Sequence, residues 1–142
     1  MVGYGPSSAS KYITTYFRQN FDITDASFFK SLTVQLLRDD GGIVYLNGVE
    51  IFRSNMPGGE VTYATNAASN LTGNEETNWL TYAINPALLV PGVNLLMFIL
   101  MNVNISIVLG ERSFKDHLIM VFIPWVKIPQ VVFSDKAFVG PI

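Results

Sequence analysis

Two adjacent aspartates stand directly before a pair of glycines, in the order Asp39-Asp40-Gly41-Gly42. Carboxylates in a tight turn offer oxygen ligands to calcium, which takes about six to eight oxygens. The same residues also favour a solvated turn at the end of a strand, and the other oxygen donors of a calcium site cannot be identified from the sequence. Asp39 and Asp40 are therefore candidate calcium ligands and candidate ligand-binding residues, with an ordinary turn as the alternative.

Side chains suited to sugar recognition follow a few residues later. Glu50, Arg53 and Asn55 carry the charged and amide groups that pair with hydroxyls through hydrogen bonds. An aromatic ring can stack on the flat face of a sugar, and three residues offer one: Tyr45, Tyr63 and Trp79. In so apolar a chain, Tyr45 and Trp79 could equally belong to the core. We expect Arg53, Asn55, Tyr45 and Trp79 to contact a ligand if the chain binds one.

A catalytic interpretation depends on one histidine, His117, which follows Asp116 and lies near Ser113. Nucleophilic hydrolysis needs a hydroxyl, a base and an orienting carboxylate that converge in space, and neighbours along one strand rarely do so. The chain also lacks the Gly-x-Ser-x-Gly motif of many hydrolases. Acidic residues for glycoside cleavage are present, but no spacing selects a pair among them: Asp39, Asp40, Glu50, Glu60, Glu75 and Glu76. We expect no enzyme activity, and an ester or lactone hydrolase using His117 is the weakest alternative.

The elements that must position these residues are predicted to be short strands. Residues 12–17 are rich in β-branched and aromatic types, residues 32–36 alternate apolar with polar, and residues 79–84 form a further strand-like run. A short strand is also predicted at 61–63 and one helical turn at 85–89. Turn formers occupy 22–27, and a long polar connection spans 66–78.

The strongest local signal is a hairpin. Two strand-like runs, 43–46 and 49–52, are separated by Asn47-Gly48, a dipeptide suited to a type I′ turn. Both central residues of that turn need positive φ, which glycine accepts freely and asparagine tolerates better than most residues. Many short strands with Gly and Pro turns indicate an all-β fold, an antiparallel β-sandwich of the jelly-roll kind.

Composition and net charge indicate which kinds of binding partner and metal site this chain can have. The 142 residues are 49% apolar and 14% charged, with a formal net charge of −2 and no cysteine. One domain over residues 1–142 fits this length. The weakly acidic charge argues against nucleic acid as a partner, and the lack of cysteine excludes disulfides and thiolate metal sites. The thin charged surface predicts a homo-oligomer, formed through exposed strand edges.

Three segments resemble a bacterial galactose-binding-like domain, a jelly-roll module of large secreted proteins. They are residues 16–18, residues 37–57 with the hairpin, and residues 88–94 with Pro91-Gly92-Val93-Asn94. The resemblance covers about residues 4–94. It implies a non-catalytic carbohydrate- or surface-binding module from a larger extracellular or periplasmic protein, although residues 1–10, an opening loop, contain no signal peptide.

The chain departs from this family in two places. Members usually have further strands before the segment that opens this chain, so we expect it to be truncated there. After Asn94 they run into an alternating strand with a glutamate and a His-Gln pair, where this chain reads Leu95-Leu96-Met97-Phe98-Ile99-Leu100. Residues 95–142 are thus an atypical apolar ending, for which a divergent or frame-altered sequence is one hypothesis. We expect its first run, 95–109, to be a buried strand, because it is too short to span a membrane as a helix. The second run contains Pro124 and Pro129 and is expected to be at most an edge or bent strand.

Overall fold

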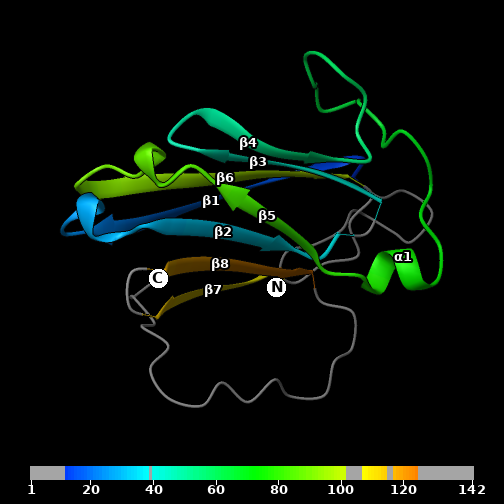
Figure 1. The fold of residues 1–142 in the computed structure, drawn as a ribbon. Coiled ribbons are helices and arrows are strands. Elements are labelled where there is room, and N and C mark those ends of the chain that lie inside the picture. Colours follow the sequence, from blue (N-terminus) through cyan, green and yellow to red (C-terminus); the bar gives the residue numbers. More distant parts are fainter. Residues whose placement is uncertain (1–11, 39, 102–106, 115–116, 125–142) are drawn as a thin grey trace.

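Two four-stranded sheets face each other (Figure 1), and a layer of hydrophobic side chains lies between them. The computed structural model describes residues 12–38, 40–101, 107–114 and 117–124. Its strands are β1 (Thr14–Ile23), β2 (Ser31–Leu36), β3 (Gly41–Leu46), β4 (Val49–Ser54), β5 (Leu80–Ile84), β6 (Gly92–Met101), β7 (Ile107–Phe114) and β8 (His117–Pro124). Three single turns of helix join them: η1 (Ala26–Phe28), α1 (Asn74–Thr77) and η2 (Pro86–Leu88). The all-β sandwich predicted from the sequence is confirmed.

The first sheet has the order β1-β6-β3-β4 and is antiparallel throughout. β1 and β6 pair over ten residues, from Thr14 opposite Met101 to Ile23 opposite Gly92. β6 also pairs with β3, with Met97 opposite Tyr45. This register lines up Arg18, Met97, Tyr45 and Glu50 in one row across the four strands.

The second sheet has the order β5-β2-β8-β7. β2 is antiparallel to β5 but parallel to β8, so this one pair departs from the antiparallel pattern of the rest. β8 lies between β2 and β7, and its last residue is Pro124, opposite Ile107. The second apolar run therefore contains an interior strand, where an edge or bent strand was expected, and Pro129 lies outside the described residues. Proline at the strand's last position interrupts the ladder least.

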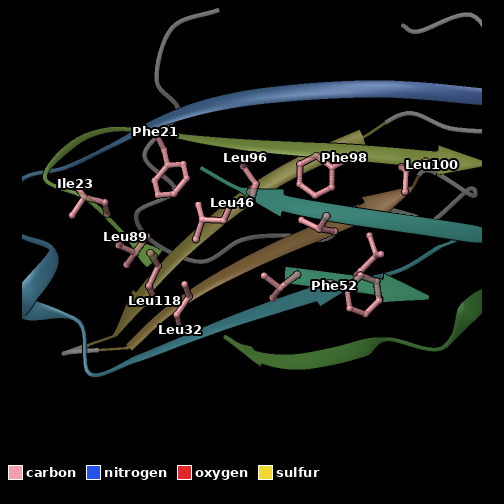
Figure 2. Close-up of a cluster of buried hydrophobic side chains, with 13 residues drawn as sticks. Phe21, Ile23, Leu32, Leu46, Phe52, Leu89, Leu96, Phe98, Leu100 and Leu118 are labelled. Atoms are coloured by element: carbon pink, nitrogen blue, oxygen red, sulfur yellow. The ribbon is translucent and has the colours of Figure 1, made fainter. Parts of the chain in front are cut away.

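The core fills the space between the sheets, and Figure 2 shows side chains from both layers pointing into it. Phe98, Val44 and Leu46 reach it from the first sheet, while Leu32 and Val34 reach it from the second, and all five are almost completely buried. Alternate residues of β2 and of the middle of β6 are buried in this layer, as expected for strands with one face on a core. Among the described residues, no helix is long and apolar enough to cross a membrane.

The hairpin forms as predicted. Asn47 and Gly48 both have positive φ, of 51° and 83°, which is the type I′ requirement. The asparagine does more than turn the chain. Its side-chain amide donates to Leu88 O at 2.8 Å and to Asn94 Oδ1 at 2.8 Å, and its Oδ1 accepts from Leu95 N at 2.8 Å. Asn47 thereby ties the hairpin to the start of β6.

Asn94 is the buried partner in this network, with no exposed surface. Its Oδ1 also accepts from Val90 N at 2.9 Å, and its Nδ2 donates to Val90 O at 2.8 Å and to Gly92 O at 3.1 Å. A buried amide is stable only when its donors and acceptors are satisfied, and here both donors and the acceptor oxygen have partners. The two asparagines therefore fix the turn that precedes β6.

Some of the local predictions from the sequence are wrong, and others are confirmed. β1 continues through Asp22, which was expected in a turn, because pairing with β6 outweighs its turn preference. The strand expected at 61–63 is a turn, closed by Thr65 N donating to Thr62 O at 3.1 Å. The buried strand expected at 95–109 is divided between β6 and β7, with 102–106 outside the described residues. The strand at 79–84 and the helical turn at 85–89 are confirmed as β5 and η2.

Candidate functional site

The outer face of the first sheet is divided into a covered half and an open half. The segment between β4 and α1, residues 55–73, is here named the covering loop (Figure 1). Ile43, Ile99 and Met101 point outward from β3 and β6 and are buried beneath it. The loop side chains that pack on them are Met56, Val61 and Ala67.

Gly41 permits the covering loop to approach the sheet closely. A Cβ at this position would lie 2.5 Å from the Met56 sulfur and 2.9 Å from the Asn55 carbonyl oxygen, both closer than real Cβ contacts. Glycine is therefore required by the backbone of the loop, not by the turn before β3. This is the reason for a glycine directly after Asp40.

Asp40 and Asn55 anchor the ends of the covering loop. Asp40 is buried, and its Oδ1 accepts from Leu71 N at 2.8 Å. The Asn55 amide donates to Asp40 O at 3.2 Å and to Ser69 O at 2.6 Å, while its Oδ1 accepts from Ser69 Oγ at 2.9 Å. Both residues have positive φ, near 59° and 50°, a conformation that Asp and Asn adopt more readily than most. Two predicted ligand-binding residues thus hold the loop.

Arg53 is the third anchor, and it shares the outer face with Glu50 and Tyr45. Its guanidinium donates to both Glu50 carboxylate oxygens at 2.7 Å, and also to Pro57 O at 2.6 Å and Gly59 O at 3.3 Å. Tyr45 donates its hydroxyl to Glu50 Oε2 at 3.3 Å. Tyr45, Glu50 and Arg53 are three of the six residues that the sequence analysis named as candidate sugar contacts, and these three lie together.

A β-bulge makes this grouping possible. Residues three apart in a regular strand point to opposite faces, so Glu50 and Arg53 would normally be separated by the sheet. In the β3–β4 pair, Tyr45 is opposite Glu50 but Val44 is opposite Phe52, which leaves Ile51 as an extra residue. Ile51 and Phe52 both pack toward the core, and Glu50 and Arg53 both face outward.

The ion pair shifts the titration of its members. Hydrogen bonds from Arg53 lower the pKa of Glu50 below its ordinary value of 4.5, while Glu50 raises the pKa of Arg53. Partial burial raises the pKa of Tyr45, and the neighbouring Glu50 carboxylate raises it further. The cluster is consequently a neutral pair with a protonated phenol at ordinary pH, and its polar groups are largely occupied by one another.

The open half of the outer face lies beside this cluster. We name it the open sheet face and define it by six residues on β1, β6 and β3: Tyr16, Arg18, Asn20, Tyr45, Leu95 and Met97. Phe17, Phe21 and Ile23 point into the core, so the alternate residues Tyr16, Arg18 and Asn20 face outward. The Tyr16 side chain is 48% exposed and that of Leu95 37%. An aromatic ring and hydrogen-bonding groups thus share one flat, accessible surface.

The covering loop forms one border of this face. Thr14, two residues before Tyr16, donates its hydroxyl to Tyr63 O at 2.9 Å. That bond holds the loop against β1, and the Tyr63 side chain there is 77% exposed. Tyr16 and Tyr63 therefore present two accessible rings where β1 meets the loop.

The remaining predicted residues lie elsewhere. Trp79 directly precedes β5 in the second sheet and is 44% exposed, so it is not in the core. His117 begins β8 opposite Phe114 and Ser31, whereas Ser113 is opposite Leu118. Asp39 and Asp116 lie outside the described residues. In the described part of the chain, no three acidic or histidine side chains gather where a metal ion could be held.

Sequence reasoning missed Tyr16 and Arg18 as parts of a surface. The signal was available, because Tyr16, Arg18, Asn20 and Asp22 occupy positions opposite in parity to the partly buried Phe17 and the buried Phe21 and Ile23. Their position opposite β6, however, depends on pairing between strands far apart in the chain, which no local pattern specifies.

Comparisons with known proteins give a matching family model and a weak similarity to a solved structure. No curated protein matches the chain. One similar solved structure is a β-D-mannosidase from Dictyoglomus thermophilum, with 16% identity and a TM-score of 0.37. The match covers 72% of this chain but 12% of that structure, so this chain spans a small part of its length. A family model matches residues 65–141, more than half of the sequence and most of the ending that the galactose-binding-like resemblance leaves out. The chain belongs to a family of unknown function, DUF5684.

Proposed function

We propose that this chain is a non-catalytic carbohydrate-binding module whose ligand lies on the open sheet face. The observation that carries the proposal is the exposed ring of Tyr16 on the same face as Arg18 and Asn20. A sugar presents an apolar face and a rim of hydroxyls, and it therefore needs a flat ring beside hydrogen-bonding groups.

The spacing of the rings supports a ligand longer than one sugar. β1 and β3 are separated by β6, and Tyr16 lies two residues along β1 from the row that contains Tyr45, so the two backbones are roughly 12 Å apart. Met97 and the buried Ile99 lie between them on β6. A surface of this width accommodates consecutive sugar rings along a chain.

Rigidity also supports the proposal. Tyr45 is fixed through Glu50, and Glu50 through two bonds from Arg53, which in turn holds the covering loop. A preorganised surface loses less conformational entropy when a ligand binds. Because Arg53 and Asn55 are engaged within the protein, we assign them the role of supporting the site.

The sequence resemblance and a candidate calcium site extend this proposal. The galactose-binding-like resemblance of residues 4–94 supports a module within a larger secreted protein. A calcium ion held with Asp39 remains part of the proposal, with Asp40 as a second ligand. Such an ion would stabilise the start of the covering loop. Asp40 already holds the other end of that loop, because its Oδ1 accepts a hydrogen bond from Leu71 N.

Affinity gel electrophoresis on a panel of soluble polysaccharides tests the proposal, with calcium and with a chelator. We expect retardation of the wild type by at least one polysaccharide. Tyr16→Ala should weaken that binding by at least fivefold, which corresponds to the roughly 1 kcal/mol or more lost when a central aromatic contact is truncated. Phe28→Ala is the matched control, because Phe28 is 54% exposed on η1, outside the open sheet face.

Two results would count against this site. Unretarded migration on every polysaccharide, with and without calcium, would refute carbohydrate binding. Loss of binding in Trp79→Ala together with wild-type binding in Tyr16→Ala would move the site to the second sheet.

Self-association is a second candidate function, favoured by the edges of the two sheets. No strand of the described residues pairs along the outer sides of β4 and β5. Exposed strand edges can pair with a second copy of the chain. Light scattering over a range of concentrations tests this, and a constant monomer mass would refute it.

A further inference from the structure

The open sheet face carries the positive charge of Arg18, which no side chain of the described residues neutralises. In the part of the chain that the structure describes, the Arg18 side chain has no ion pair and no hydrogen bond. Its cross-strand neighbour is Met97, and the residues two positions away on its own strand are Tyr16 and Asn20. Arg18 is exposed, so its guanidinium is available to a ligand.

The other charges on this face do not offset Arg18. Glu50 lies in the same row, but both of its oxygens accept hydrogen bonds from Arg53. Asp22 faces outward four residues along β1, roughly 13 Å away at the rise of a strand. Salt screens charges beyond about 8–10 Å, so Asp22 does not compensate for Arg18 in physiological buffer.

We propose that the ligand of the open sheet face is an acidic polysaccharide, whose sugar carboxylate pairs with Arg18 while a sugar ring stacks on Tyr16. This inference rests on the proposed function and adds the class of sugar. The planar guanidinium donates two parallel hydrogen bonds to a carboxylate, which gives both charge and orientation. Tyr16 and Arg18 are two residues apart on one strand, so their side chains lie on the same face of the sheet and one sugar unit reaches both.

A pair of matched polymers tests the inference: polygalacturonate and the same polymer with its carboxyl groups reduced to alcohols. We expect the wild type to bind the acidic form about fivefold more tightly, since an exposed ion pair contributes no more than this. Arg18→Gln should remove the preference, so that both polymers bind with equal affinity. The preference should also weaken as salt is added.

Lys30→Gln is the control, because it removes the same charge from an exposed residue outside the open sheet face. Tyr16→Ala should weaken binding of both polymers. Circular dichroism confirms that each variant folds, and Arg18→Lys provides a second, conservative variant that keeps the charge but loses the paired geometry.

The possible results separate the two proposals. Equal binding of both polymers by the wild type would overturn the acidic ligand and leave carbohydrate binding intact. A preference that survives Arg18→Gln would overturn the assignment to Arg18. Absence of binding to both polymers would overturn this inference, whereas the proposed function falls only if every neutral polysaccharide also fails.

Discussion

Removing the Asn94 side chain should destabilise the fold strongly. Asn94 is fully buried and takes part in four hydrogen bonds, to Asn47, to Gly92 and twice to Val90. Asn94→Ala leaves two donors and two acceptors without their partner. At roughly 1 kcal/mol net for each bond, the loss is about 4 kcal/mol. Val90 is 44% exposed, so water replaces part of its two bonds, and we expect about 3 kcal/mol.

Urea unfolding followed by circular dichroism measures this loss. With a dependence on urea of about 2 kcal/mol/M, the midpoint should fall by roughly 1.5 M. Asn85→Ala is the matched control, because Asn85 is exposed and its Oδ1 accepts one bond, from Ala87 N at 3.0 Å. Removing this cap should cost about 1 kcal/mol or less.

The comparison of the two variants tests the reasoning. If Asn94→Ala lowers the midpoint no more than Asn85→Ala, the buried network does not fix the turn before β6. A change in the urea dependence of the unfolding free energy would indicate a different denatured state, and the midpoints could then not be compared directly.

Two further predictions concern the covered half of the sheet and its ion pair. Gly41→Ala should cost about 1–3 kcal/mol and speed limited proteolysis within residues 55–73, because the new Cβ would displace the Asn55 carbonyl. Gly58→Ala, with open space around it, should change neither, and equal proteolysis of the two variants would contradict the close approach. Glu50→Gln should lower stability at pH 7 by less than about 1 kcal/mol, since both side chains of the pair are partly exposed. Because the pKa of Glu50 is lower in the folded state, the ion pair adds stability at pH values above the ordinary pKa of 4.5, and this stability is lost on acidification. The difference in melting temperature between wild type and Glu50→Gln should therefore narrow below that pH. A gap independent of pH would show that the pair is not its cause.

Local chemistry made part of the fold predictable. Asn47-Gly48 specifies its own hairpin, because the turn type depends on the two residues themselves. The alternation at 32–36 likewise predicted β2, in which Leu32, Val34 and Leu36 are all buried. Such features need no knowledge of distant parts of the chain.

Long-range pairing determined what the sequence did not reveal. Asp22 favours turns, yet it continues β1 because Val93 lies opposite it. Side-chain chemistry led to Asp40 and Asn55 as candidate ligand contacts, but it did not reveal that they anchor the covering loop, because their positive φ values and their bonds to Leu71 and Ser69 depend on the fold. The open sheet face could not be predicted, since it is assembled from three strands whose order is visible only in the fold.

The parallel pair between β2 and β8 affects how the chain folds. Ser31 lies opposite His117, so β8, the second neighbour of β2, is synthesised only when the polypeptide is nearly complete. During synthesis on the ribosome, β2 and β5 can associate early, but the side of β2 that β8 will occupy stays unpaired until late. Contacts between such distant segments slow folding, and an unpaired strand in a nascent chain invites aggregation. Expression at low temperature or with chaperones should therefore raise the soluble yield of this protein.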